Sequence, residues 1–255
     1  MSNWERQLEK INLKTADNEM LDFKRKSARI YKNLFKSTED ELLKLLEEIE
    51  ENPTRSTLYE YKKYYEFRNK LIAQLDSLGI KINSSMTYNL EKTYKKVQSN
   101  VNNLLPNAKE MSDVPLEKVT EVISKDWVGD GKNYSMRIWK DKDRLLGAIE
   151  KGLNECLLRG DSKDKFVEQL MNDFNTGYYN ANRLARTEII RTMNQSTLDR
   201  YNQAGITKVK VVVKIDDRTC DKCKAQNGKV FDLDKIKTSD YMLHPNCRCT
   251  IVPII

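Results

Sequence analysis

Four cysteines and the only histidine of this chain lie within 30 residues, from Cys220 to Cys249. They form two pairs with two-residue spacers, Cys220-x2-Cys223 and His244-x2-Cys247, and Cys249 follows one residue after the second pair. A tight turn places both side chains of such a pair on one metal ion, and thiolates with imidazole are the ligands of tetrahedral zinc sites. The spacing therefore predicts a structural zinc ion held by four of these five residues.

One of the five ligands is in excess, and either Cys247 or Cys249 is expected to be the spare one. On an extended strand, two residues separated by a single residue point the same way but lie about 6 to 7 Å apart, which is too far for both to bind one ion easily. Two other interpretations stay open, namely disulfides in an exported protein and free thiols packed as small hydrophobic groups. The first residues contain no apolar segment typical of an export signal, so a reducing cytoplasm is expected. The distant Cys156 is expected to be a core residue.

The composition is typical of long helices. The 255 residues include 33% charged residues but only nine glycines and five prolines, and few breakers favour long helices with short connections. The net charge is +7, and most of the positive excess lies from Arg200 onward. Such a surplus is compatible with nucleic acid or an acidic partner, although a solvated basic face is the commoner explanation. No stretch approaches a membrane span, so no membrane partner is expected.

The first two parts of the chain show helical periodicity. Residues 1–106 predict a helical bundle, with helix boundaries expected at a capping box over residues 37–41, at Asn52-Pro53 and at Gly79. Residues 107–206 predict a further helical region that begins with a linker and includes a loop over residues 127–131. Its last helix is expected to run from about Asn180 to Ala204, after a separate helix that begins at a cap formed by Asp161-Ser162.

The helical periodicity stops in the last part, residues 207–255. Valines at 209, 211 and 213 alternate with other residues, and Thr250-Ile-Val252 follows near the end, so a small sheet is expected. Asn227-Gly228 predicts a hairpin turn. The fold class is therefore mainly α, with an N-terminal helical bundle, a helical region and a small C-terminal zinc-stabilised α+β module.

Charged residues near the predicted zinc ligands are expected to have two roles, bracing the site and forming a surface for a partner. Asp216 and Arg218 just precede Cys220, and they are expected to brace the site or to pair with Arg186 and Glu188 of the preceding long helix. Four cations, Lys208, Lys210, Lys214 and Arg248, are expected to form a surface that faces a partner, with DNA as one candidate.

Roughly residues 110 to 255 resemble the phage head morphogenesis family of Mu F-like minor head proteins. The resemblance rests on an ordered set of motifs: Trp127 with Gly131, Ser135-Met-Arg137-Ile-Trp139, Gly160, Asn182-Arg-Leu-Ala-Arg186-Thr187-Glu188, Asn194, Tyr201, Gly205, Asp216-x-Arg218-Thr-Cys220-x2-Cys223, Asn227-Gly228 and His244-Pro245-x-Cys247-Arg248-Cys249. The closing Asp-x-Arg-Thr-Cys-x2-Cys and His-Pro-x-Cys-Arg-Cys motifs are the most specific part.

The resemblance implies a minor capsid protein of a tailed phage. Such a protein is carried inside the head of the virion, after assembly in the host cytoplasm, and acts in procapsid assembly, genome packaging or DNA delivery. The implied partners are the portal protein and capsid or scaffolding proteins, with double-stranded DNA as a further candidate. The surface expected from Lys208, Lys210, Lys214 and Arg248 would then be DNA-facing or portal-facing.

Enzymatic alternatives are weaker. A zinc-centred HNH-like nuclease needs a histidine to activate water, and the single His244 cannot serve as both base and zinc ligand. Arg186-Thr187-Glu188 superficially resembles an Arg-Ser-Glu element of ADP-ribosyltransferases, but no Glu-x-Glu loop accompanies it. We therefore expect no enzymatic activity and no catalytic residue. The alternative is a DNA-binding or DNA-processing protein that uses the zinc module.

Overall fold

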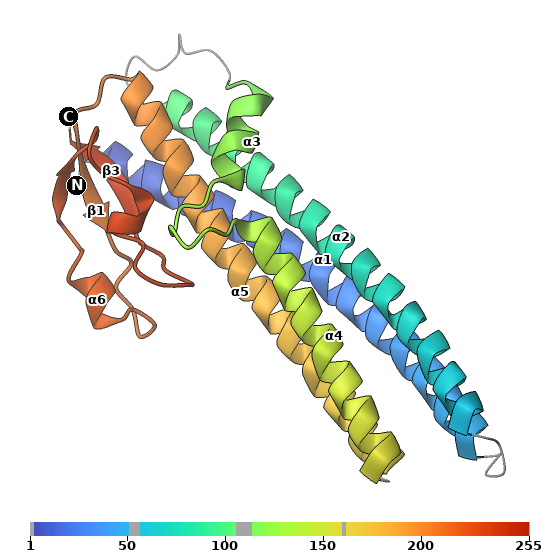
Figure 1. Cartoon of the computed structure of the whole chain (residues 1–255). Helices are drawn as coiled ribbons and strands as arrows, with labels where there is room; N and C mark the ends of the chain where they lie inside the picture. The colour runs from blue at the N-terminus through green and yellow to red at the C-terminus, as the bar shows by residue number, and fades with distance from the viewer. Residues whose placement is uncertain (1–2, 51–56, 106–113, 160–161, 255) are drawn as a thin grey trace. The chain divides into compact units, whose positions relative to one another are not determined.

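The computed structural model describes residues 3–50, 57–105, 114–159 and 162–254. Within these ranges the chain is mainly helical, and a small three-stranded antiparallel sheet follows the long helices (Figure 1). This confirms the predicted mainly α class with a small β-containing C-terminal module. The elements are α1 (Asn3–Glu50), α2 (Thr57–Leu104), α3 (Leu116–Ser124), α4 (Tyr134–Arg159), α5 (Lys163–Gln203), β1 (Lys208–Val212), α6 (Asp221–Lys224), β2 (Val230–Asp232), η2 (Thr238–Asp240) and β3 (Thr250–Ile254).

The chain forms two compact units, each assembled from segments that are distant in the sequence. Unit 1 comprises Met1–Phe23, Met86–Tyr134 and Arg183–Ile255, whereas unit 2 comprises Lys24–Ser85 and Ser135–Asn182. The long helices α1, α2 and α5 contribute residues to both units. No helix in the described ranges is long and apolar enough to cross a membrane.

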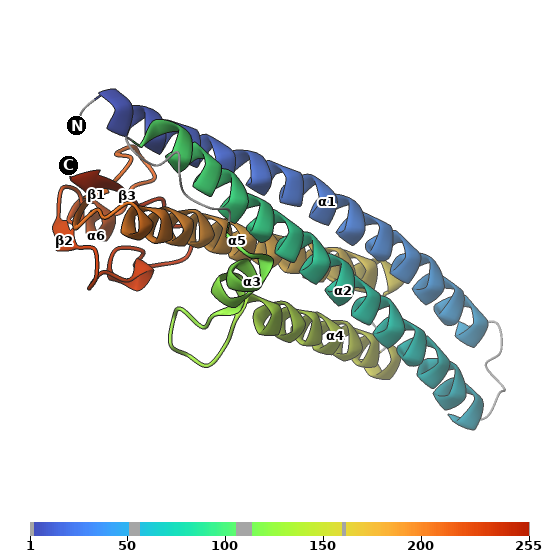
Figure 2. The same cartoon turned by 90° about the horizontal axis from the view of Figure 1, so that it is seen from above.

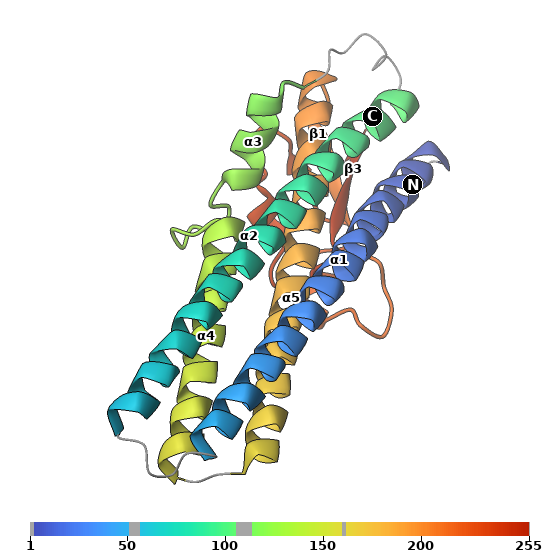
Figure 3. The same ribbon diagram turned by 90° about the vertical axis from the view of Figure 1, so that its right-hand side faces the viewer.

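Unit 2 is a bundle of four helix segments, from α1, α2, α4 and α5 (Figure 3). Each segment runs antiparallel to its neighbours in the ring, as in up-and-down bundles. Contacts between neighbours close the ring, and they join Gln74 to Glu41 (α2 to α1), Arg68 to Glu150 (α2 to α4), Gly152 to Phe166 (α4 to α5) and Phe35 to Phe174 (α1 to α5).

Three helix boundaries predicted from the sequence are wrong, because tertiary contacts continue the helices. At the expected capping box, α1 continues, and Thr38 is buried with its hydroxyl donating to Gln74 of α2. The expected end at Gly79 lies inside α2, and the expected start near Asn180 lies inside α5. Ser162 does accept a hydrogen bond from the backbone of Lys165, as a helix cap would. Asn52-Pro53 and the linker after residue 106 lie outside the described residues.

Position 79 inside α2 requires a glycine because the indole of Trp139 packs against the helix backbone there. A Cβ at this position would lie 2.8 Å from the Trp139 ring, whereas a Cβ at Gly147 of α4 would meet nothing within 4 Å. Gly79→Ala should therefore lower the free energy of unfolding by roughly 1 to 2 kcal/mol, because steric crowding exceeds the gain in helix propensity. The matched control, Gly147→Ala, should raise it by roughly 0.5 to 1 kcal/mol. Urea denaturation measures both, and a stabilising Gly79→Ala would contradict this packing.

The end of α5 is the centre of unit 1. All side chains from Thr187 to Asn194 are buried, although many of them are polar. Buried polar groups need hydrogen-bond partners, and the surrounding segments supply them. The contacts of this part of α5 join Thr197 to Asn12 of α1, Asp199 to Tyr94 and Ser196 to Gln98 of α2, Arg191 to the carbonyl of Val122 in α3, and Glu188 to Trp127.

The small sheet has the order β2-β1-β3 and lies beside α5 in unit 1 (Figure 2). Val209 and Val211 of β1 are buried, as the alternation in the sequence predicted. In the register, Lys208 is opposite Asp232 of β2 and Ile254 of β3. Gly228 has a positive φ and donates its backbone N–H to Val211, so the predicted turn exists. It closes a long connection that includes α6 rather than a two-residue hairpin.

Candidate metal centre

Cys220 and Cys223 are positioned by the first turn of the short helix α6. Cys220 is the N-cap residue, and its thiol accepts the backbone N–H of Cys223 at 3.4 Å. The cap and the helical turn bring both sulfur atoms to the same side, which is the geometry that the two-residue spacer predicted. Cys223 is buried and Cys220 is exposed, so the pair extends from the interior to the surface.

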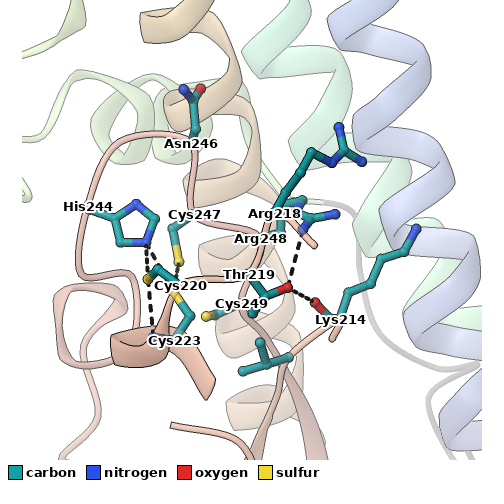
Figure 4. A pocket seen from close by; sticks show the side chains of 11 residues that line it. Lys214, Arg218, Thr219, Cys220, Cys223, His244, Asn246, Cys247, Arg248 and Cys249 are labelled. Carbon is teal, nitrogen blue, oxygen red and sulfur yellow. Dashed lines mark hydrogen bonds between the residues drawn. The ribbon is translucent and has the colours of Figure 1, made fainter. Parts of the chain in front are cut away.

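His244 faces this pair with the nitrogen that a metal would need. Its Nε2 lies 3.2 Å from the sulfur of Cys220 and 3.1 Å from that of Cys223 (Figure 4). Its other nitrogen, Nδ1, lies 2.8 Å from the carbonyl oxygen of Pro245, which can only accept a hydrogen bond. Nδ1 therefore carries the proton, and the Nε2 lone pair is directed at the two thiols. The same hydrogen bond raises the pKa of His244.

The chain after His244 brings two more thiols to the cluster. The backbone N–H of Cys247 donates to the carbonyl of His244, and Asn246 takes a positive φ in the turn between them. The sulfur of Cys247 lies 3.6 Å from that of Cys223. The sulfurs of Cys223, Cys247 and Cys249 all lie within 4.8 Å of one another, as do the ligand atoms of Cys220, Cys223 and His244. The five residues named from the sequence therefore form one cluster that can hold a metal ion.

The three inner thiols interact strongly with one another. Burial raises the pKa of the Cys223 thiol to about 12, whereas the hydrogen bond from Cys249 lowers the pKa of Cys247 to about 5. The same hydrogen bond raises the pKa of Cys249. Thiols crowded in this way favour a shared negative charge, which a bound cation would neutralise while it displaces their protons.

Asp216 and Arg248 join the two segments that carry the ligands. Arg248 lies between Cys247 and Cys249, and its guanidinium donates to both carboxylate oxygens of Asp216, one of them at 2.7 Å. Asp216 also accepts the backbone N–H of Arg218 and the hydroxyl of Thr219. The Arg248 hydrogen bonds hold the pKa of Asp216 well below its usual range. This bidentate pair braces the loop before Cys220 against the segment before β3 that carries the last two cysteines.

Breaking this brace should weaken metal binding without removing a ligand. Arg248→Lys keeps the charge but cannot form the bidentate pair, so we expect a loss of about 10-fold to 100-fold in zinc affinity. Asp216→Asn should have a similar effect, and the exposed neighbour Asp217→Asn serves as the control. Competition with a chromogenic chelator measures the affinities. Equal affinities for all three variants would show that the pair does not support the site.

The helix α5 forms the wall behind the cluster. The side-chain amide of Asn194 donates to the carbonyl of Cys249 at 2.9 Å, and the Thr187 hydroxyl accepts the backbone N–H of Asn246. Sequence reasoning named both residues as part of a motif but gave them no role. Glu188 does not reach Asp216 or Arg218, because it accepts the indole N–H of Trp127. Arg186 is half-buried, close enough to Arg218 and Arg248 for their charges to lower its pKa after the larger effect of burial.

The four cations predicted as a DNA-facing or portal-facing surface differ in exposure and in their contacts. Lys208 and Lys214 are exposed, and Lys210 is partly exposed on β1. Arg248 is engaged with Asp216 and lines the hollow beside the cysteines together with Lys214 and Arg218.

These features define a mainly helical protein whose small C-terminal module contains a Cys/His cluster able to hold a metal ion. Residues 147–252 match the model of the family described as "Phage Mu protein F like protein". The chain therefore carries a Phage Mu protein F-like domain, which belongs to a head morphogenesis family. The match includes the second half of α4, all of α5 and the whole cluster, whereas the motif residues from Trp127 to Trp139 precede it.

One curated relative is 23% identical over 287 aligned residues, which span all of this chain and 55% of the relative. It is described as "NAD(+)--arginine ADP-ribosyltransferase EFV" of Enterococcus faecalis (strain ATCC 700802 / V583). This chain thus spans about half the length of that protein. No solved structure matches the chain significantly.

Proposed function

We propose that this chain is a non-enzymatic minor head protein of a tailed phage. It acts inside the head with the portal protein and with capsid or scaffolding proteins, in procapsid assembly, genome packaging or DNA delivery. The observation that carries the proposal is the family match over residues 147–252, which begins in α4 and takes in α5 and the cluster packed against it.

The metal in the proposal is zinc, and its role is structural. Thiolates and a neutral imidazole suit zinc, and the two pairs with two-residue spacers supply a tetrahedral set. We assign Cys220, Cys223, His244 and Cys247 as ligands, because the sulfur of Cys247 is 3.6 Å from that of Cys223 and Cys247 is in the turn with His244. Cys249 is fully buried, and Asn194 holds its carbonyl. A bound ion would cross-link the loop before α6 to the turn before β3.

Reconstitution of heads tests the functional proposal. The chain should be produced together with the portal, scaffolding and major capsid proteins of the same phage, and procapsids should then be separated by sedimentation. We expect the chain to sediment with procapsids in few copies, and to be lost from particles assembled without portal or without scaffold. A chain that stays at the top of the gradient, with complete particles below, would overturn the proposal.

The chemistry of two residues favours a non-enzymatic role. His244 is the only imidazole in the sequence, and both of its nitrogens are engaged, so no base remains for an HNH-like nuclease. Glu188, the acid of the Arg-Thr-Glu motif, is 3% exposed and accepts the indole N–H of Trp127. A carboxylate in that position is shielded from a substrate. Incubation with NAD+ and an arginine analogue as the ADP-ribose acceptor should give no nicotinamide, and metal-dependent nicking of plasmid DNA should be absent.

A second candidate function is DNA binding by the metal module itself. The exposure of Lys208 and Lys214 favours it. Replacing the three lysines 208, 210 and 214 by Gln should then abolish a gel shift on duplex DNA at low salt, and the shift should weaken steeply as salt is added. A gel shift that persists in this variant would exclude the module as the DNA contact.

A further inference from the structure

A short stretch of α1 in unit 2 carries only cations among its charged residues. Residues 24–36 include six Lys and Arg but no Asp or Glu. Four of them, Arg25, Arg29, Lys32 and Lys36, are spaced by four, three and four residues, which places them within about 60° on the helix surface. We call these four the cationic stripe. All four are exposed, and they lie opposite the buried Tyr31, which packs against Tyr178 of α5.

The stripe lacks the acidic partners that cations have elsewhere on this surface. In the described part of the chain, five Lys or Arg residues pair with an acid three residues away, namely Lys63 with Glu66, Lys118 with Glu121, Arg144 with Asp141, Lys224 with Asp221 and Lys235 with Asp232. None of the four stripe side chains has an ion pair or hydrogen bond among the described residues. Like charges three and four residues apart destabilise a helix by a few tenths of a kcal/mol per pair. The stripe therefore costs stability, and no ion pair or hydrogen bond of its side chains to another described residue offsets this cost.

The chemistry of the stripe fits a polyphosphate better than a protein surface. Protein interfaces have apolar or aromatic anchors at their centre and are depleted in lysine. No large apolar side chain is exposed between residues 24 and 36. The stripe spans 11 helical steps, or about 16 Å, and duplex DNA presents one negative charge per about 1.7 Å, so about nine phosphates lie within its length.

We propose that the cationic stripe of α1 binds the phosphate backbone of duplex DNA without reading its sequence. This site goes beyond the proposed function, and it lies in unit 2, whereas the cluster belongs to unit 1. Contact through phosphates alone keeps the protein mobile along DNA and makes binding depend on salt. Loss of the site should leave zinc content and incorporation into procapsids intact, so the two proposals can fail separately.

Fluorescence anisotropy with a labelled duplex tests the stripe in the zinc-loaded full chain. One variant replaces Arg25, Arg29, Lys32 and Lys36 by Gln. A control variant removes the same number of charges elsewhere on the exposed surface, through Lys118→Gln, Arg144→Gln, Lys151→Gln and Lys235→Gln. We expect the stripe variant to lose at least 10-fold in affinity at about 50 mM salt, and its salt slope to fall by about 3.6, which is 0.9 for each of four phosphate contacts. The control should change affinity less than threefold.

A measurement on the unaltered protein does not depend on the folding of any variant. Bound duplex should protect Lys32 and Lys36 from acetylation, as read by mass spectrometry, while the exposed Lys118 stays reactive. Equal affinity losses in the two variants would overturn the proposal and indicate a general effect of net charge. No DNA binding by the unaltered protein, or no protection of Lys32 and Lys36, would also overturn it. Protection by an acidic polypeptide but not by DNA would assign the stripe to a protein partner instead.

Discussion

Purified protein is expected to contain about one zinc ion per chain, and removal of the zinc is expected to unfold the C-terminal module. The sheet in this module has strands of only five, three and five residues. So small a segment buries little apolar surface on folding. Zinc binding in small modules supplies free energy on the order of 10 kcal/mol, which is enough to decide whether the module folds. Elemental analysis gives the zinc content, and calorimetry before and after chelation gives the loss of structure.

Variants of single cysteines make this prediction specific to the cluster. Cys220→Ser and Cys223→Ser should lose the zinc, and so should Cys247→Ser. Cys249→Ser should retain it if the assignment of the four ligands is right. Cys156→Ser is the matched control, because this buried thiol is in α4 of unit 2. Protein that contains no metal but stoichiometric disulfides would contradict the zinc proposal. Loss of zinc in Cys249→Ser but not in Cys247→Ser would exchange the roles of these two residues.

The cluster could be predicted from the sequence because its geometry is local. A two-residue spacer fixes the placement of two side chains whatever the rest of the fold does, so Cys220 and Cys223 come together through one capped turn. The meeting of the two pairs could be expected from ligand chemistry. The choice between Cys247 and Cys249 could not be made, because it depends on the turn at Asn246 and on the contact of Asn194 with the Cys249 backbone.

The braces around the cluster could not be predicted because they are long-range. The partner of Arg248 is 32 residues away, and that of Glu188 is 61 residues away. Spacing carries no signal for such pairs. The same reason explains the wrong helix boundaries. Gly79 is typical of a helix end, but here the close approach of Trp139 requires it inside a helix.

The burial of the polar face of α5 could not be predicted from hydrophobic periodicity either. A helix whose buried residues include Thr187, Glu188 and Arg191 shows little apolar periodicity, although it is central to unit 1. Periodicity reports burial only when buried residues are apolar. Here the segments around the helix supply hydrogen bonds instead, and their positions depend on the fold.

Glu188→Ala is expected to lower the free energy of unfolding by about 3 to 5 kcal/mol, because it leaves a buried charge without its counter-charge. Arg191 is 1% exposed, and burial lowers its pKa while the charge of Glu188 raises it. Trp127→Phe, the milder control, keeps an aromatic ring but loses the N–H that donates to Glu188, and it should cost about 1.5 to 3 kcal/mol. Replacing the pair together, by Glu188→Leu with Arg191→Met, should restore much of the stability. Urea denaturation of the unaltered protein, Glu188→Leu, Arg191→Met and the double variant gives the double-mutant cycle.

A second variant of Glu188 distinguishes a structural role of this residue from a catalytic one. A catalytic glutamate could be replaced by Gln with little loss of stability, while a transferase activity would disappear. If Glu188 instead balances the charge of Arg191, Glu188→Gln should also destabilise unit 1, although it keeps an acceptor for the Trp127 N–H. Neither the Glu188→Gln variant nor the unaltered protein should then release nicotinamide from NAD+. A stable Glu188→Gln variant that abolishes a measurable activity of the unaltered protein would show that the chain is an enzyme.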